Sequence, residues 1–214
     1  MTGSQLIHRT IIYIDGFNFY YGALRNTKSK WLNLESLFRR VLGPKNDIVK
    51  VKYFTAKVQP TPSDPNVHVR QNAYLNAIQN HCPLVEVYFG HFLQHSVRME
   101  NAHPPPNTVE VWKKEEKGSD VNLALHILND AWLDAYDCAV IVSNDSDLAE
   151  SLRLVKFQHK KLIGLITPGS PTRKTSKQLK RYADFMRTIR GSALQKSQLP
   201  DPIPGTTIKK PPAW

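Results

Sequence analysis

Short apolar runs alternate along the chain with longer segments in which apolar residues recur at every third or fourth position. Alternation of this kind predicts an α/β domain. The apolar runs predict strands at residues 10–15, 48–56, 84–93, 138–142 and 161–166. The periodic segments predict helices near residues 34–42, 66–80, 120–133, 147–157 and 173–181. Because the first strand is nearly all apolar, we expect it to be central in the sheet.

Regions of different composition connect and follow these elements. Residues 94–107 predict a surface loop, and residues 109–113 predict a short extended segment after it. A short strand at residues 185–189 completes the predicted domain, which covers residues 1–190. Residues 191–214 hold five prolines and few large apolar residues, which predicts an extended, Pro-rich C-terminal tail. Part of this tail is expected to dock through the anchors Ile203, Ile208 and Trp214.

The overall composition is that of an ordinary globular protein. The 214 residues are 41% hydrophobic and 22% charged, which is enough to build a sizeable core. No apolar stretch has the length needed to cross a bilayer, and the N-terminal residues lack the apolar region of a signal peptide. The two cysteines, Cys82 and Cys138, have no zinc-site or redox spacing. These features favour a reducing, cytoplasmic location and no membrane partner.

The formal net charge of +11 is concentrated in one part of the chain. Residues 1–155 contain 16 basic and 16 acidic residues, whereas residues 156–214 contain 13 basic and only two acidic ones. A concentrated basic surface attracts polyanions by Coulomb steering and by release of counterions. The charge therefore favours nucleic acid as a partner, although a basic surface that serves solubility would have the same composition.

Four aspartates lie where predicted strands end or helices begin. Asp15 ends the first strand, Asp145 and Asp147 follow the strand at 138–142, and Asp120 opens a predicted helix. Because the carboxyl ends of parallel strands share one edge of a sheet, these side chains can meet there. Carboxylates in one place repel each other unless a cation neutralises them, and Mg²⁺ and Mn²⁺ prefer such oxygen ligands.

Each aspartate also has a simpler interpretation as a helix cap. Asp15 and Asn18 are residue types common wherever a strand gives way to a helix, and an acid at a helix N-terminus is stabilising by itself. The segment at 143–147 contains two carboxylates beside Ser143 and Asn144, which exceeds what capping requires. Both interpretations stay open for the aspartates taken singly.

Asp120 depends most on its neighbours. Ser119 is the better N-cap of the predicted helix, which leaves Asp120 in the first turn, where acids are favoured in any case. Gly118 permits a close approach to a ligand, and Lys117 is long enough to reach a phosphate. The preceding charged run at 113–116 is interpreted as a solvated segment.

Three short motifs in this order resemble the signature blocks of NYN domains. The motifs are Ile14-Asp15-Gly16-Phe17-Asn18, Lys117-Gly118-Ser119-Asp120 and Ser143-Asn144-Asp145-Ser146-Asp147. NYN domains belong to the PIN-like nuclease superfamily, and bacterial proteins grouped as DUF88 or LabA-like are similar in pattern. The resemblance covers roughly residues 10–190.

The resemblance implies a doubly wound, Rossmann-like, mostly parallel sheet with an acidic pocket at the strand ends. It also implies hydrolysis of RNA with Mg²⁺ or Mn²⁺ as cofactor. The implied metal ligands are Asp15, Asp120, Asp145 and Asp147, and Asn18 joins them as a catalytic residue. Candidate substrate-binding residues are Lys117, Ser143 and Asn144 in the motifs, with Lys174 and Lys177 in the basic C-terminal quarter.

Other functions remain compatible with the same sequence. A non-catalytic RNA-binding or regulatory module would keep the pocket without turnover, and a nuclease acting on DNA would use the same phosphate chemistry. A phosphatase of the haloacid dehalogenase type is disfavoured, because Phe17 stands where that family requires a second aspartate. The sequence leaves open whether cleavage is endo- or exonucleolytic, how many ions bind, and whether the protein forms a homodimer.

Overall fold

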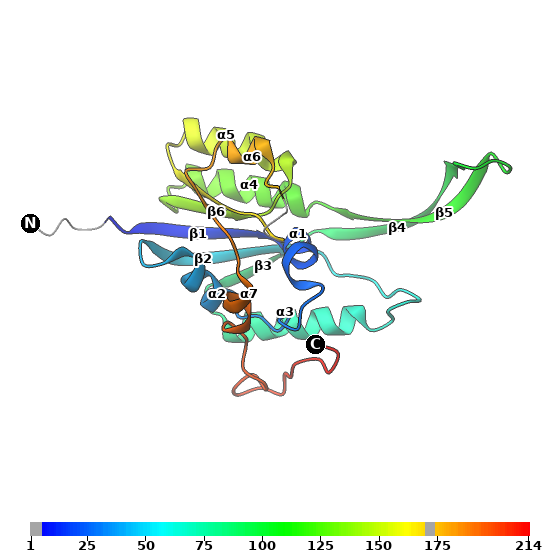
Figure 1. The fold of residues 1–214 in the computed structure, drawn as a ribbon, viewed down its shortest axis with the longest axis horizontal. Coiled ribbons are helices and arrows are strands. Elements are labelled where there is room, and N and C mark those ends of the chain that lie inside the picture. The colour runs from blue at the N-terminus through cyan, green and yellow to red at the C-terminus, as the bar shows by residue number, and fades with distance from the viewer. Residues whose placement is uncertain (1–5, 170–173) are drawn as a thin grey trace, which may run out of the picture.

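Six parallel strands form the central sheet of the computed structural model, which describes residues 6–169 and 174–214 (Figure 1). Their order across the sheet is β3-β2-β1-β6-β7-β8. The bounds are β1 (His8–Asp15), β2 (Asn46–Thr55), β3 (Val85–Phe89), β6 (Cys138–Val142), β7 (Leu162–Ile166) and β8 (Phe185–Arg187). The chain starts in the middle, adds β2 and β3 on one side, and then adds β6, β7 and β8 on the other. This order confirms the predicted doubly wound α/β fold.

Strand β1 is buried on both faces, as its apolar sequence predicts. Ile12 and Ile14 point into one core cluster, whereas Ile11 and Tyr13 belong to the cluster on the opposite face. Side chains alternate between the faces of a strand, so only a strand covered on both sides needs apolar residues at consecutive positions. Because β1 pairs with both β2 and β6, its C-terminal residue Asp15 lies beside the ends of those two strands.

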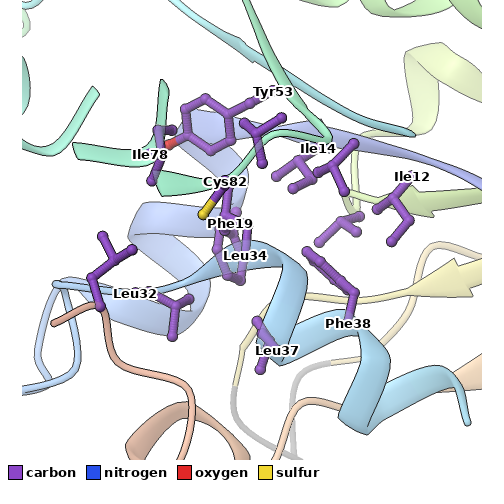
Figure 2. Packing of buried hydrophobic residues seen from close by; sticks show 14 of the residues in the cluster. Ile12, Ile14, Phe19, Leu32, Leu34, Leu37, Phe38, Tyr53, Ile78 and Cys82 are labelled. Carbon is purple, nitrogen blue, oxygen red and sulfur yellow. The ribbon is translucent and has the colours of Figure 1, made fainter. Parts of the chain in front are cut away.

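Helices cover both faces of the sheet (Figure 1). One face carries α2 (Leu34–Leu42), α3 (Val67–His81) and α7 (Gly191–Gln195). The other face carries α4 (Ser119–Trp132), α5 (Ala149–Phe157) and α6 (Lys177–Lys180). Shorter turns at the strand ends are α1 (Gly16–Phe19), the π-helix η1 (Tyr20–Leu24) and the 3₁₀ helix η2 (Ser146–Leu148). Figure 2 shows the first cluster, in which Leu34, Leu37 and Phe38 of α2 pack with residues of the sheet.

The predicted strand at 84–93 is confirmed at residues 85–89 but ends early, and the predicted loop at 94–107 is wrong over residues 94–100. The extended segment predicted at 109–113 lies within the strand Thr108–Lys117. Strand β3 ends at Phe89, and β4 (His91–Glu100) then pairs antiparallel with β5 (Thr108–Lys117) in a separate two-stranded sheet. This hairpin projects from the end of the central sheet (Figure 1). Most of its residues are solvent-exposed and polar, so the chain there lacks the apolar alternation by which a half-buried strand is recognised. Gly90 makes the exit from the central sheet, where a Cβ would lie 2.6 Å from the Lys117 carbonyl oxygen.

The C-terminal residues contribute to the core beneath α2 and α3. Leu194, Leu199 and Ile203 are buried in the first cluster, and Ile208 and Trp214 pack against it. The Trp31 Nε1 group donates a hydrogen bond of 3.0 Å to the Pro200 carbonyl. These contacts agree with the expected docking of the tail, while the domain boundary at residue 190 stays a prediction.

Two further sequence expectations concern the C-terminal half and the membrane. The helix predicted near 173–181 is α6, and residue 173 lies outside the described residues. Among the helices of the described ranges, none is long and apolar enough to span a bilayer.

Candidate active site

The carboxylate of Asp15 joins the ends of the two central strands. The residue is 6% exposed, and its Oδ1 accepts a hydrogen bond of 2.8 Å from the backbone N–H of Asn18. Its Oδ2 accepts a bond of 2.9 Å from the Ser143 hydroxyl, which follows β6. Asp15 is therefore a cap of α1, as the simpler interpretation holds. It is also fixed from a second strand, which capping does not require.

The segment after β6 is ordered by its own side chains and by Asn18. The Asp145 backbone N–H donates to Ser143 Oγ at 3.1 Å, and Asp145 Oδ1 accepts from the Asp147 backbone N–H at 3.0 Å. The Asn144 backbone N–H donates to Asn18 Oδ1 at 3.3 Å. The Ser143 hydroxyl thus links Asp15 to the Asp145 backbone, and Asn18 links the two neighbouring strand ends a second time.

The side chain of Asn144 binds the following loop. Its Nδ2 donates to the Lys174 carbonyl at 3.2 Å, and its Oδ1 accepts from the Ser176 backbone N–H at 2.7 Å. The structure therefore places Asn144 and the backbone of Lys174 together. The Lys174 side chain is exposed.

Three of the four predicted acids line one cleft of about 290 Å³ at the carboxyl edge of the sheet. Phe17, Asn18 and Tyr21 of the α1–η1 segment form one wall. The full lining comprises Asp15, Phe17, Asn18, Tyr21, Phe92, Glu116, Ser119, Asp120 and Asp145. We call this the acid cleft.

The carboxylates of the acid cleft repel one another. Burial raises the pKa of Asp120 to about 6, with smaller contributions from the negative charges of Asp15, Asp145, Glu116 and Asp147. Burial also raises the pKa of Asp15, against the stabilising hydrogen bonds from Asn18 and Ser143. Asp145 and Glu116 add to that rise. In the ligand-free protein, negative charge in the cleft is thus unfavourable, which is the condition a bound cation would relieve.

Glu116 is a residue of the cleft that the sequence analysis assigned to a solvated run. It lies on β5 opposite Phe92 of β4, and both side chains line the cleft. Its Oε1 accepts a hydrogen bond of 3.0 Å from the Ser119 backbone N–H at the start of α4. The hairpin is the feature that would have revealed this residue. Because β5 runs directly into α4, Glu116 near the end of the strand lies close to Asp120 in the first turn of the helix.

Comparison with known families identifies the fold and the motifs together. The NYN domain family matches residues 9–190, which include the three aspartate motifs and all six strands of the central sheet except the first residue of β1. The chain belongs to the NYN domain family. It is thus a PIN-like domain of the nuclease superfamily, as the motifs predict.

Two similar proteins place this NYN domain among its relatives. The 6-hydroxy-3-succinoylpyridine 3-monooxygenase HspA of Pseudomonas putida is 35% identical over 96% of this chain and 75% of its own length. A crystal structure of a protein of unknown function from Vibrio parahaemolyticus matches with a TM-score of 0.58 and 19% identity. That match covers 89% of this chain and 98% of the other, and it supports the fold.

The remaining predicted site residues of the NYN domain lie around the cleft. Asp147 and Lys177 line a neighbouring hollow on the α5–α6 side, together with Arg181. Asp147 is near enough to raise the pKa of Asp120 slightly. The side chain of Lys117 is half exposed and pairs with Glu115 at 3.2 Å along the hairpin. Their roles in metal or substrate binding stay predictions.

The donor set of the acid cleft fits a hard divalent cation. Over the described ranges, no group of three His, Cys, Asp or Glu side chains stands close enough to hold one ion between them. Mg²⁺ commonly keeps several waters and binds through one or two carboxylates plus substrate phosphates, so it does not require such a cage. Asp15, Asp120, Asp145 and Glu116 supply only oxygen donors, which is the chemistry that Mg²⁺ and Mn²⁺ prefer.

A second, larger cavity of about 430 Å³ adjoins the acid cleft. Phe17 and Tyr21 line both, so the α1–η1 segment lies between them. The aromatic residues around the second cavity are Phe17, Tyr20, Tyr21, Tyr53, Tyr74 and Trp214. We call it the aromatic cavity.

Proposed function

We propose that this NYN domain is a metal-dependent ribonuclease that hydrolyses phosphodiester bonds at the acid cleft with Mg²⁺ or Mn²⁺. The observation that supports the proposal is the gathering of carboxylates around Asp120, whose pKa is raised to about 6 by burial and by its acidic neighbours. A cation that neutralises these acids can also bind a phosphate oxygen, which links the cleft to a nucleic-acid substrate. The basic C-terminal quarter supplies the charge that attracts RNA.

Different residues of the acid cleft would bind the ion, orient the carboxylates and contact the phosphate. One or two of the carboxylates Asp15, Asp120 and Asp145 would bind the ion directly, and the other acids of the cleft, Glu116 among them, would bind the waters that the ion keeps. When bound, a divalent ion lowers the pKa of water and neutralises the charge that develops on the phosphate. Ser143 fixes the orientation of Asp15 by donating to its Oδ2. The Asn18 amide, held by the Asn144 backbone, lines the cleft where it can donate to a phosphate oxygen.

The decisive experiment is cleavage of a mixed RNA and DNA panel by the purified protein with Mn²⁺ or Mg²⁺. We expect RNA cleavage that EDTA abolishes and that Asp15→Asn and Asp145→Asn each remove. Asparagine keeps an oxygen that can accept the Asn18 or Asp147 N–H, so both variants should remain folded. If both cleave RNA as well as the unsubstituted protein, the assignment is wrong. Salt-sensitive RNA binding without cleavage would support the non-catalytic module, and cleavage of DNA alone would support a DNA nuclease.

Glu116→Gln tests whether the hairpin contributes to the same site. The amide can still accept from Ser119, so the variant removes charge while keeping the hydrogen bond that begins α4. Glu110→Gln, an exposed change on the same strand, is the matched control. We expect the Glu116 change to lower the apparent affinity for Mn²⁺ and the Glu110 change to leave it unaltered. Equal affinities for the two variants would remove Glu116 from the proposed site.

A second candidate function is mono-oxygenation of a small heteroaromatic compound. It is favoured by the 35% identity, over nearly the whole chain, to the Pseudomonas putida protein named as a monooxygenase. The test is dioxygen uptake by the purified protein with 6-hydroxy-3-succinoylpyridine and NADH as electron donor. Substrate-dependent uptake without RNA cleavage would replace the ribonuclease proposal, whereas cleavage without uptake would leave the ribonuclease alone.

A further inference from the structure

The aromatic cavity is built from three parts of the chain that are distant in sequence. The α1–η1 segment supplies Tyr20 and Tyr21, α3 supplies Tyr74, and the C-terminal tail supplies Trp214. Trp214 packs against Tyr74 with ring centroids 6.0 Å apart. A cavity of about 430 Å³ is within the range of roughly 300–1,000 Å³ that small-molecule sites occupy. Its aromatic walls favour a planar ring, which can stack against them or meet them edge-on.

Tyr53 places a hydroxyl without a partner in this cavity. The residue is 7% exposed, and no hydrogen bond joins its Oη to another atom of the described residues. A Cβ added to Gly16 would lie 2.9 Å from that hydroxyl, so the group rests against the turn that follows Asp15. The hydroxyl keeps some solvent access at the cavity wall, so a polar atom of a ligand that enters the cavity can form a hydrogen bond with it.

The polar groups of the cavity carry an excess of positive charge. Three cations, Arg25, Lys30 and Arg70, line it with one carboxylate, Asp64. Arg70 is ion-paired with Asp64. Arg25 lies over the ring of Tyr21, 5.3 Å from its centroid, and neither Arg25 nor Lys30 has an acidic partner in the described part of the chain. The unpaired charge favours an anionic ligand.

Gln71 also lines the cavity, but its side-chain amide is already hydrogen-bonded to backbone groups. Gln71 Oε1 accepts from the Val58 backbone N–H at 2.9 Å, and its Nε2 donates to the Ala56 carbonyl at 2.9 Å. Recognition of a ligand therefore rests on the Tyr53 hydroxyl and the two unpaired cations rather than on this amide.

We propose that the aromatic cavity binds a small planar aromatic anion. The ring lies among the tyrosines and Trp214, a polar ring substituent bonds the Tyr53 hydroxyl, and the anionic group meets Arg25 and Lys30. An aromatic carboxylate and a mononucleotide both have this chemistry. The site is independent of the reaction at the acid cleft, because none of its binding groups is one of the proposed metal ligands.

The test is titration calorimetry of the full chain in EDTA with 4-hydroxybenzoate, 4-hydroxyphenylacetate and uridine 5′-monophosphate as probes. Uncharged 4-hydroxybenzamide and uridine are the matched neutral probes. We expect at least one anionic probe to bind with a Kd below about 1 mM and its neutral counterpart to bind roughly ten-fold more weakly. Tighter binding of the carboxylates would identify an aromatic acid as the ligand, and tighter binding of the phosphate would identify a nucleotide.

Two variants test the named contacts. Tyr53→Phe removes only the hydroxyl and is expected to weaken binding roughly five-fold, and Arg25→Gln is expected to weaken it roughly ten-fold. Arg40→Gln, a change of an exposed cation on α2 away from this cavity, should leave the Kd unaltered. Thermal unfolding of each variant establishes that it is folded. The proposal is overturned if no anionic probe binds below about 10 mM, or if Tyr53→Phe and Arg25→Gln both bind as the unsubstituted protein does.

Discussion

Replacing Asp120 by asparagine should stabilise the metal-free protein at neutral pH. The carboxylate of Asp120 is half buried and faces the negative charges of Asp15, Asp145 and Glu116, which together with burial raise its pKa from 3.8 to about 6. An acid whose pKa is raised by folding is ionised at a cost to the folded state. Asparagine has nearly the same shape and carries no charge, so the substitution removes that cost.

The size of the effect and its pH dependence follow from the pKa. A rise from 3.8 to about 6 corresponds to about 3 kcal/mol at roughly 1.4 kcal/mol per pH unit. Solvent screening of a half-exposed group reduces this to about 1–2 kcal/mol. Because the folded state holds the proton more tightly, the cost is absent below about pH 4, grows as the pH rises through about 6, and is complete above it. The variant should therefore equal the unsubstituted protein near pH 4 and exceed it near pH 7.5.

Urea unfolding in EDTA at a series of pH values measures this difference. Asp134→Asn is the control, because Lys161 and Arg9 lower the pKa of Asp134 and its removal should bring no gain at any pH. Adding about 10 mM Mg²⁺ near pH 7.5 should stabilise the unsubstituted protein more than the Asp120 variant, since the ion neutralises the same charge. If Asp120→Asn destabilises the metal-free protein near pH 7.5, the reasoning from carboxylate repulsion is refuted.

Three further predictions concern the core and the turn beside the site. Asp130→Ala leaves the buried Lys52 ammonium without its carboxylate partner at 2.6 Å, and we expect the free energy of unfolding, measured in urea, to fall by about 3–5 kcal/mol. Glu86→Ala, which breaks the more exposed Lys50–Glu86 ion pair between β2 and β3, should lower it by under about 1 kcal/mol. Gly16→Ala places a Cβ 2.6 Å from a backbone carbonyl of β2, and the crowding should cost about 1–3 kcal/mol; an unchanged urea midpoint would contradict it. Ile203→Ala should cost about 2–4 kcal/mol and make residues 190–214 accessible to limited proteolysis, whereas a tail equally protected in both proteins would show that this anchor is dispensable.

The strands at the centre of the sheet, β1, β6 and β7, could be predicted from sequence because they are buried on both faces. A run such as that of β6, with all five residues buried, has no other reasonable place in a protein of this size. The α2 helix could be predicted equally well, since its apolar spacing agrees with a capping Asn33, whose Oδ1 accepts the Ser36 N–H at 2.9 Å. In both cases local preference and burial favour the same structure.

The β4–β5 hairpin could not be predicted in the same way. As a result, the residues that it contributes to the acid cleft could not be predicted either. An exposed two-stranded arm has no buried face to impose an apolar alternation, so its polar residues look like those of a loop. Because the hairpin was not predicted, the position of Glu116 within the charged segment 113–116 could not be related to the aspartates of the cleft. The aromatic cavity was missed for a related reason: Tyr20, Tyr74 and Trp214 come together only through tertiary packing of distant segments.

The turn after β1 joins the two cavities in a way that the motif alone does not reveal. Asp15 is directed toward Ser143 and the acid cleft, while the following Gly16 leaves room for the Tyr53 hydroxyl on the other side. A side chain at Gly16 would meet both that hydroxyl and a carbonyl of β2, so glycine is required here by close approach. The residues that follow, Phe17 and Tyr21, then form a wall common to both cavities, and Tyr21 belongs to a π-helix, an irregularity frequent at functional sites. The metal chemistry that the motif suggests and the ligand selectivity that the aromatic cavity suggests therefore both depend on one short segment, and a substitution there should be assayed for both.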